Sequence, residues 1–318
     1  MAVEEVAEPE LRPGTARIAI AAAGTGFANL LAIEGRHQNS PALPFTPGTE
    51  AGGTVLEVAD DVDRLVPGQR VAASVRYGAF AEQAVVPIDN LFPLPDAVDF
   101  ATATHFPSIY ATAYGCLVLH GRLRRGESLL VHGAGGGSGL AAVDLGRHLG
   151  ARVIATAGDA AKLAAARASG AAHLINHRDE DFRQRVLELT DGRGVDAVFD
   201  PVGGEMFRQS LRCVAPEARL FPVGFVSGDI PQIPANILLV KNISVHGVNW
   251  GYYAGWSRTP RTARDIERVH AGMAELFRWC AEGHLAPVLH GTFDLADFAA
   301  ALDLIADRKV IGKVVLTT

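Results

Sequence analysis

Residues 129–163, LLVHGAGGGSGLAAVDLGRHLGARVIATAGDAAKL, decide the fold class of this chain. A short apolar run precedes six glycines between Gly133 and Gly146, and helical spacing then leads to a second apolar run at 152–157. Glycine has backbone freedom that other residues lack, so a glycine-rich link suits a tight turn from a strand into a helix. The stretch therefore predicts a strand, a glycine loop, a helix and a second strand.

The alternation of strand and helix patterns continues beyond this stretch. Strand-like runs at 173–176, 195–204, 218–225 and 243–251 are separated by segments of helical spacing. Strands that alternate with helices of this length indicate βαβ units, a parallel sheet and right-handed crossovers. We expect an α/β fold in which residues 107–248 form a doubly wound parallel sheet domain.

The segments on either side of that domain have a different pattern. Runs at 15–24 and 52–60 are strand-like, and residues 78–87, between a glycine and a proline, suggest a hairpin. We expect a small β unit over residues 1–106. Residues 249–318 contain two helical patterns, each followed by a strand pattern, and we expect them to return to the β unit.

Composition limits the partners and the location. The net charge is −6 and the pI is near 6.0, which argues against nucleic acid or an anionic membrane as the main partner. No stretch is apolar enough to span a bilayer, and the acidic start lacks a secretory signal. Three scattered cysteines suggest reduced thiols. We expect a cytoplasmic protein that acts on a small molecule.

The glycine loop predicts a dinucleotide site. As a fingerprint, its positions are Ala134, Gly136 and Gly139, with alanine where the first glycine is usual. Backbone N–H groups and the positive end of the helix dipole favour a pyrophosphate at the helix start. A tight βα turn without a ligand is the alternative interpretation.

The end of the next strand bears on the choice of dinucleotide. Ala157 stands where an acidic residue would bind the ribose hydroxyl of NAD, whereas Lys162, His177 and Arg178 could place positive charge near a 2′-phosphate. We therefore expect NADP(H). Asp159 keeps NAD open, since it lies close enough to act as that acid, and Lys162 could also be an ordinary solvated residue.

At this point the chain resembles the zinc-free quinone oxidoreductases and enone reductases of the medium-chain dehydrogenase/reductase superfamily. LPFTPGTEAGG at 43–53 is the most specific match, and FPSIYATAYGCL at 106–117, the glycine loop and IGKVVLTT at 311–318 also match. The resemblance implies a GroES-like β domain interrupted by a Rossmann-fold domain, with the active site in the cleft between them.

The resemblance also implies a site without metal. Thr49 replaces the histidine that zinc enzymes of the superfamily carry in PGHE, and Gly26 stands near the position of their cysteine. Three cysteines cannot supply a four-cysteine zinc lobe. Simple alcohol oxidation in this superfamily uses a Lewis acid, so the resemblance instead implies hydride transfer from NADPH to a quinone or an α,β-unsaturated carbonyl.

Candidate residues follow from the loop and from the matched positions. Thr112 matches a family position beside the nicotinamide, although a helix-interior threonine is the alternative; Tyr110 either lines the cleft or fills it. These two are the catalytic candidates. The cofactor-binding candidates are Thr112, Gly135, Gly136, Gly137, Ser138, Gly139, Thr156, Lys162, His177, Gly203, Gly224, Phe225, Ser227, Val248, Trp250 and Lys313.

The expected substrate pocket departs from the family pattern. Its candidates are Phe27, Asn29, His37, Tyr110 and Trp250. Gly26 and Asn29 stand where the family commonly has asparagine and aspartate, His37 replaces a tyrosine, and Ser138 replaces a valine. His105 and His132 are polar residues for which a core or surface position is the more ordinary interpretation, and Lys313 could be a surface lysine.

Two other functions remain open. An enoyl-thioester reductase would need basic residues for the phosphates of its substrate, and Arg258 and Arg261 could serve. A non-catalytic NADPH-binding, sensing or RNA-binding protein is the alternative of another class. The resemblance further implies a homodimer through an edge strand near residues 243–250.

Overall fold

The computed structural model describes residues 1–37 and 40–318, and contacts divide the chain into two units. The first unit comprises Met1–Ser108, Gly251–His284 and Val288–Thr318. The second comprises Ile109–Trp250 and Leu285–Pro287. The chain therefore enters the second unit before the glycine loop and leaves it after the last parallel strand.

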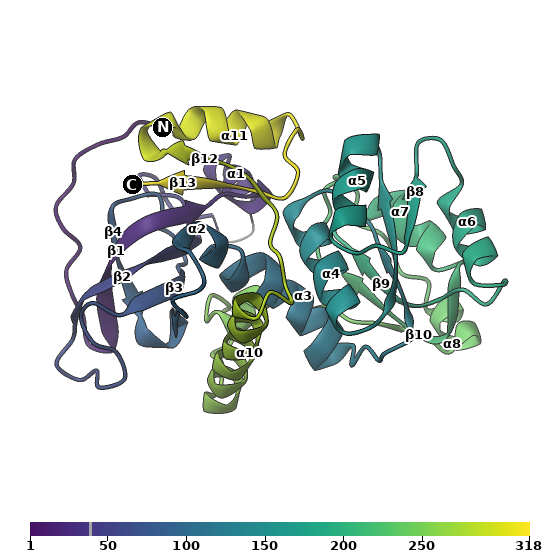
Figure 1. Ribbon diagram of the computed structural model, residues 1–318, viewed down its shortest axis with the longest axis horizontal. Coiled ribbons are helices and arrows are strands. Elements are labelled where there is room, and N and C mark those ends of the chain that lie inside the picture. Colours follow the sequence, from purple (N-terminus) through teal and green to yellow (C-terminus); the bar gives the residue numbers. More distant parts are fainter. Residues whose placement is uncertain (38–39) are drawn as a thin grey trace. The chain divides into compact units, whose positions relative to one another are not determined.

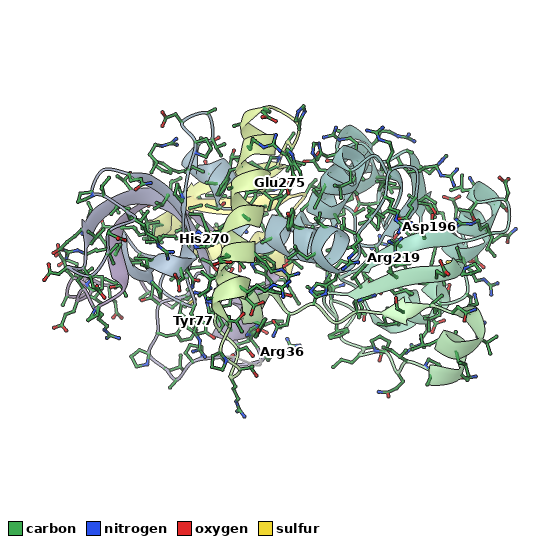
Figure 2. All side chains as sticks on the ribbon, turned by 90° about the horizontal axis from the view of Figure 1, so that it is seen from below. Arg36, Tyr77, Asp196, Arg219, His270 and Glu275 are labelled. Carbon is green, nitrogen blue, oxygen red and sulfur yellow. The ribbon has the colours of Figure 1, made fainter. Side chains whose placement is uncertain are left out.

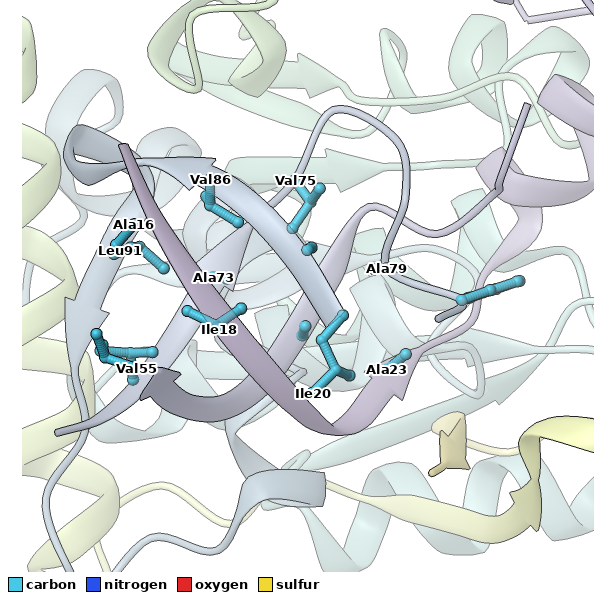
Figure 3. Close-up of a cluster of buried hydrophobic side chains, with 14 of the residues drawn as sticks. Ala16, Ile18, Ile20, Ala23, Val55, Ala73, Val75, Ala79, Val86 and Leu91 are labelled. Carbon is cyan, nitrogen blue, oxygen red and sulfur yellow. The ribbon is translucent and has the colours of Figure 1, made fainter. Parts of the chain in front are cut away.

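A seven-stranded sheet organises the first unit (Figure 1). The hydrogen-bonded order is β12-β13-β1-β2-β3-β5, and β4 also pairs with β1. The strands are β1 Thr15–Gly24, β2 Glu50–Val58, β3 Arg70–Ser74, β4 Gln83–Pro87, β5 Leu91–Pro93, β12 Leu289–Asp294 and β13 Lys313–Thr317. Alternate residues of β1 are buried, as expected for a strand with one face in the core. That core gathers Ile18, Val55, Val86 and Leu91 (Figure 3).

Helices complete the first unit. They are α1 Phe27–Ile33, α2 Phe100–Ala103, α9 Trp250–Tyr253, which begins on the last residue of the second unit, α10 Ala263–Ala281 and α11 Phe298–Ala306, with short 3₁₀ turns at Ile88–Asn90 and Leu295–Asp297. The long helix α10 buries one face, including Met273 and Phe277. The ring of His270, labelled in Figure 2, packs at a tilt against the Phe92 ring of β5, with the two ring centroids 5.0 Å apart, and so ties α10 to the sheet.

The C-terminal segment Val288–Thr318 belongs to the first unit. Strand β13 pairs antiparallel with β1, with Ala22 opposite Thr317. The predicted hairpin at 78–87 is wrong, because only Gln83–Pro87 forms a strand and its partner is β1. The first half instead bonds to the 47–48 turn: the N–H groups of Gly78 and Phe80 donate to the Pro47 carbonyl.

The second unit contains a six-stranded, all-parallel sheet, which confirms the predicted Rossmann-type domain. Its order is β11-β10-β9-β6-β7-β8, surrounded by helices (Figure 1). The strands are β6 Ser128–Val131, β7 Arg152–Ala157, β8 His173–Asn176, β9 Val195–Asp200, β10 Val214–Pro222 and β11 Ser244–Val245. The helices are α3 Ala111–Tyr114, α4 Gly137–His148, α5 Ala160–Ala168, α6 Phe182–Leu189, α7 Gly204–Ser210 and α8 Ala235–Lys241, with π-helical turns at Phe106–Tyr110 and Gly115–His120.

The strand order places the glycine loop at a switch point. From β6 the chain moves outward to β7 and β8, and then crosses back so that β9 lies on the other side of β6. In such sheets ligands bind outside the carboxyl ends of the strands where the order reverses. The loop after β6 occupies that position.

The amino ends of these strands carry polar contacts that serve the fold. Asp196 Oδ2 accepts hydrogen bonds from Ser128 N and Oγ, each 2.8 Å long. Arg219, labelled with Asp196 in Figure 2, forms an ion pair with Glu127 at 2.8 Å. These side chains tie β6, β9 and β10 together.

None of the helices in the described part of the chain has both the length and the apolar character needed to cross a bilayer.

Candidate functional site

The glycine loop forms an open cradle at the start of α4. Gly133 has φ +57°, and a Cβ built on Gly139 would lie 2.3 Å from the Gly133 carbonyl oxygen. Glycine at these positions therefore allows the turn and the close packing of helix on loop. Gly136 is the N-cap of α4 and supplies no side chain to the helix start, and its built Cβ would meet nothing nearer than 3.7 Å. The first N–H groups of α4 thus face an open position suited to an anion.

A second loop, residues 201–204 after β9, packs against the first. A Cβ built on Gly133 would lie 3.2 Å from Pro201. Asp200 shapes this second loop, because its Oδ1 accepts hydrogen bonds from Val202 N at 2.7 Å and Gly203 N at 3.0 Å. Gly203 has φ +74°, a conformation that favours glycine.

A third loop, residues 224–229 after β10, lies on the second. Ser227 N donates to the Val202 carbonyl at 3.0 Å, and Gly204 N donates to the Asp229 carbonyl at 2.9 Å. The structure therefore brings together four predicted cofactor residues, Gly203, Gly224, Phe225 and Ser227, beside the glycine loop. The Phe225 side chain is large, apolar and 41% exposed, so it offers a surface to a ligand.

Positive side chains gather where β7 and β8 end. A Cβ built on Gly158 would lie 2.9 Å from Arg178 Nε and 3.3 Å from His177 Nε2. The aliphatic stem of Lys162 covers Gly135, whose built Cβ would lie 2.3 Å from Lys162 Cγ. Burial, followed by the charge of Arg178, lowers the pKa of His177. The cationic groups here are thus those of Lys162 and Arg178.

Asp159, the residue that could bind the ribose hydroxyl of NAD, caps a helix. Its Oδ1 accepts a hydrogen bond from Lys162 N at 2.9 Å and so caps α5, while Oδ2 lies 3.4 Å from Lys162 Nζ. The backbone hydrogen bond to Lys162 lowers the pKa of this carboxyl. Both oxygens are therefore engaged within the α5 turn.

Other candidates in the second unit occupy different surroundings. Thr112 is partly exposed on α3. Val248 and Trp250 pack on Gly115, whose built Cβ would lie 3.3 Å from each. Thr156 is fully buried, and its hydroxyl lies 2.9 Å from His132 Nδ1. Its side chain thus faces the core.

Tyr110 is also a buried residue. Its ring is 2% exposed, and its hydroxyl donates to Asp144 Oδ2 at 2.7 Å. The sequence left open whether this tyrosine lines or fills a cleft. The structure places it as a filling residue whose hydroxyl already has an acceptor.

His105 and His132, the two histidines considered in the sequence analysis, are buried in the core. His132 bonds Thr156 and Ser210 through its two ring nitrogens, and burial lowers its pKa. In the first unit, both ring nitrogens of His105 lie within 3.2 Å of carbonyl oxygens. Burial and then the charge of Lys313 lower the pKa of His105 to about 4.

Lys313 is buried rather than a surface lysine, with 3% of its side chain exposed. Its ammonium forms an ion pair with Glu50, and the hydroxyl of Thr49 donates to the other oxygen of that carboxylate at 2.5 Å. The PGTE motif therefore holds a carboxylate with both oxygens occupied. Within residues 1–37 and 40–318, no group of three or more His, Cys, Asp or Glu side chains is arranged to hold a metal ion.

The remaining pocket candidates belong to the first unit. Phe27 is 38% exposed on α1, whereas Asn29 on the same helix is buried. His37 is half-buried, and burial lowers its pKa. Arg261, considered for a thioester phosphate, donates to Asn90 Oδ1 and to the Tyr253 carbonyl, each at 2.8 Å.

Sequence reasoning missed two carboxylates that shape the site. Asp200 orders the second loop, and Asp144 on α4 binds Tyr110. The only local signal for Asp200 is an acid at the end of an apolar strand; Asp144 lies in a helix with no sequence signal for its partner.

Comparisons with known proteins agree with this geometry. Residues 12–96 match the alcohol dehydrogenase GroES-like domain, and residues 137–267 match the family described as zinc-binding dehydrogenase. The quinone oxidoreductase-like protein 2 homolog of Nematostella vectensis is 38% identical over 95% of this chain and 81% of its own length. The Pseudomonas aeruginosa quinone oxidoreductase is 34% identical over 96% of this chain and 91% of its own.

A solved structure supports the same assignment. Escherichia coli quinone oxidoreductase, crystallised with NADPH, is 28% identical, with a TM-score of 0.89 over 99% of this chain and 95% of its own. The relatives cover both units and the structure reproduces their fold. The chain therefore belongs to the medium-chain dehydrogenase/reductase superfamily, and within it to the quinone oxidoreductase-like oxidoreductases.

Proposed function

We propose that this protein transfers hydride from NADPH to a quinone or an α,β-unsaturated carbonyl without a metal. The observation that carries the proposal is the open cradle at the uncapped start of α4, at the switch point of the sheet. Bound NADPH would supply the hydride. The residues of the chain would orient the bound cofactor, and backbone N–H groups at Gly135–Gly139 would hold its pyrophosphate.

The other cofactor candidates divide by position around this cradle. Lys162 and His177 would lie toward the adenosine phosphate, and Gly203, Gly224, Phe225 and Ser227 would cover the opposite side. Thr112, Val248 and Trp250 would lie toward the nicotinamide. The backbone of Thr156 supports the glycine loop, since its carbonyl accepts the Ala134 N–H at 3.0 Å.

Preference for NADP(H) follows from the charges at the ends of β7 and β8. Lys162 and Arg178 offer two cations to a 2′-phosphate, and the carboxylate of Asp159 is engaged as the cap of α5. Lys162→Ala should raise the Kd for NADPH about tenfold and change the Kd for NADH less than about twofold. Lys162→Arg serves as the charge-retaining control. Equal weakening of both cofactors would contradict this assignment.

Direct hydride transfer suits the groups that the fold offers. A quinone or enone moves its negative charge onto a conjugated oxygen, so fixed hydrogen-bond donors can stabilise the product without a strong base. His105 and His132 have lowered pKa values and both ring nitrogens engaged. Neither is placed to act as a general base.

The test measures NADPH oxidation with 1,4-benzoquinone, 9,10-phenanthrenequinone and crotonyl-CoA, with NADH in parallel. Turnover with a quinone and NADPH would support the proposal. Turnover with crotonyl-CoA alone would favour the enoyl-thioester reductase, for which the engaged guanidinium of Arg261 is poorly suited. Tight NADPH binding without turnover would favour the non-catalytic alternative.

We also propose a homodimer formed through β11. This strand lies at one edge of the parallel sheet, and the preceding helix exposes 79% of both Leu239 and Val240. An unpaired edge beside apolar side chains favours association with a second copy. Light scattering should give twice the mass of 33.6 kDa, and Leu239→Lys should shift it toward the monomer.

We further propose that the protein is located in the cytoplasm. None of Cys116, Cys213 and Cys280 forms a disulfide in the structure, which agrees with a reducing compartment. Fractionation of cells expressing the tagged chain should recover it with cytoplasmic markers.

A further inference from the structure

The carboxylate of Asp144 joins three segments of the second unit. Asp144 lies on α4 and is 2% exposed. Its Oδ2 accepts hydrogen bonds from Tyr110 Oη at 2.7 Å and from Ala286 N at 2.8 Å. Its Oδ1 accepts from Arg147 Nη2 at 2.8 Å. Three donors thus satisfy one buried charge.

The partners of this carboxylate lie where the chain enters and rejoins the second unit. Tyr110 is the second residue of Ile109–Trp250, and it ends the π-helical turn Phe106–Tyr110. Ala286 is the middle residue of Leu285–Pro287, the short segment that rejoins the second unit. Asp144 therefore fastens both segments to the helix that begins at the glycine loop.

The arrangement bears on Thr112, which lies two residues after Tyr110 on the adjoining helical turn. A carboxylate buried with good hydrogen bonds holds its donors firmly, because an unpaired charge in the interior is costly. Asp144 lies about two turns along α4 from the glycine loop. Its contact with Tyr110 therefore sets the distance between the Thr112 segment and that loop.

We propose, resting on the proposed function, that Asp144 is a positioning residue for hydride transfer and that Tyr110 acts through it rather than on the substrate. The pair keeps the Thr112 segment in register with the glycine loop. Loss of the contact leaves the pyrophosphate cradle in place but misplaces the nicotinamide side of the site, which slows the chemical step more than it weakens cofactor binding.

The experiment compares Tyr110→Phe, Asp144→Leu and the double variant, all as full chains; leucine is close to aspartate in size and offers no acceptor to Tyr110 or Ala286. Tyr252→Phe is the matched control, since its hydroxyl donates to Asp265 at 2.8 Å in the first unit and so removes the same kind of contact elsewhere. Single-turnover hydride transfer with NADPH deuterated at C4, the Kd for NADPH and the melting temperature are measured for each. We expect both single variants to slow hydride transfer roughly tenfold, with the Kd changed less than about threefold.

The double variant separates the possible roles. Positioning by a joined pair predicts that it loses no more than either single variant. If Tyr110→Phe alone abolishes turnover and Asp144→Leu retains it, Tyr110 acts on the substrate and the proposal fails. A fall in melting temperature with unchanged hydride transfer would show a purely structural contact and would also overturn it.

A readout independent of turnover keeps this test separate from that of the proposed function. Amide hydrogen exchange at Ala286 should accelerate in Asp144→Leu, which removes its acceptor, and stay unchanged in Tyr252→Phe, whether or not a substrate is reduced. If the wild-type chain reduces no acceptor but this exchange behaves as expected, the proposed function fails while the anchoring contact stands. Unchanged exchange at Ala286 would refute the anchor itself.

Discussion

At the scale of single residues, the site depends on side chains that are absent as much as on those present. Gly136 leaves the helix start open, and Gly139 lets α4 approach the loop to a distance at which a Cβ would collide. Asp159 caps α5 and Asp200 Oδ1 accepts the Val202 N–H, whereas the buried Oδ2 of Asp200 has no hydrogen-bond partner among the described residues. The cradle is therefore built from main chain, which suits an anionic ligand.

Gly136→Asp should abolish cofactor binding while the fold persists. The built Cβ meets nothing nearer than 3.7 Å, and aspartate is a favourable N-cap, so the melting temperature should not fall. A carboxylate at the pyrophosphate should raise the Kd for NADPH by about 100-fold or more. Gly136→Asn is the control of equal size without charge. Equal affinity for the two variants would show that charge at this position does not matter.

His105 should make stability depend on pH on the acid side. Its pKa is about 4 in the folded chain against about 6.5 when exposed, so the unfolded state binds the proton first. The contribution is complete above about pH 6.5 and is lost as the pH falls toward 4. His105→Gln should reduce the difference in unfolding free energy between pH 7 and pH 4.5 by up to about 3 kcal/mol.

Urea unfolding at several pH values gives this measurement. The parent chain, measured alongside under the same conditions, is the reference. An identical pH dependence for His105→Gln would rule out a proton taken up at this histidine on unfolding.

At the scale of elements, local sequence signals and packing act together. Helix α10 begins with a reciprocal capping box between Thr262 and Asp265, and its apolar stripe covers the sheet of the first unit. Helix α4 has no such cap. The contrast is physical: a structural helix satisfies its own first N–H groups, whereas a helix at a ligand site leaves them available.

Thr262→Ala should lower the free energy of unfolding by about 1 kcal/mol, because it removes the acceptor for the Asp265 N–H. Denaturant titration checks this value, and NADPH affinity should stay unchanged. Thr259→Ala, three residues earlier and exposed, is the control and should be neutral within about 0.5 kcal/mol. A neutral Thr262→Ala would mean that packing alone holds the start of α10.

At the scale of the whole molecule, long-range contacts decide how the chain returns to its first unit. Strand β13 lies between β12 and β1, so the last residues occupy the middle of a sheet begun by the first. The buried pair of Glu50 and Lys313 joins residues 263 positions apart. This pair ties the C-terminal strand to β2 across β1.

Lys313→Met should destabilise the chain by about 3–5 kcal/mol, because it leaves the buried carboxylate of Glu50 without its cation. The double variant Glu50→Gln with Lys313→Met should recover part of that loss. Urea unfolding measures both. A cost below about 1 kcal/mol for Lys313→Met would show that Glu50 finds another partner or takes up a proton.

Much of the fold could be predicted because its signals are local. The alternation after Leu129 predicts the parallel sheet, and the glycines at 133–139 predict the cradle. The prediction of a hairpin at 78–87 is wrong because no signal in the neighbouring sequence reveals that β4 pairs with β1. The predicted strand at 243–251 is only Ser244–Val245 in the structure, where it pairs with Arg219 and Leu220 of β10.

By itself the sequence determined the fold class and the place of the glycine loop, since periodicity and glycine spacing act over a few neighbouring residues, and its motifs carried the resemblance to the superfamily. Only the tertiary structure decided the partners of the buried polar groups. Tyr110 meets Asp144, Lys313 meets Glu50, and the carboxylate of Asp159 caps a helix. A buried hydrogen bond depends on which groups are brought together in space, and that follows from the packing of distant segments.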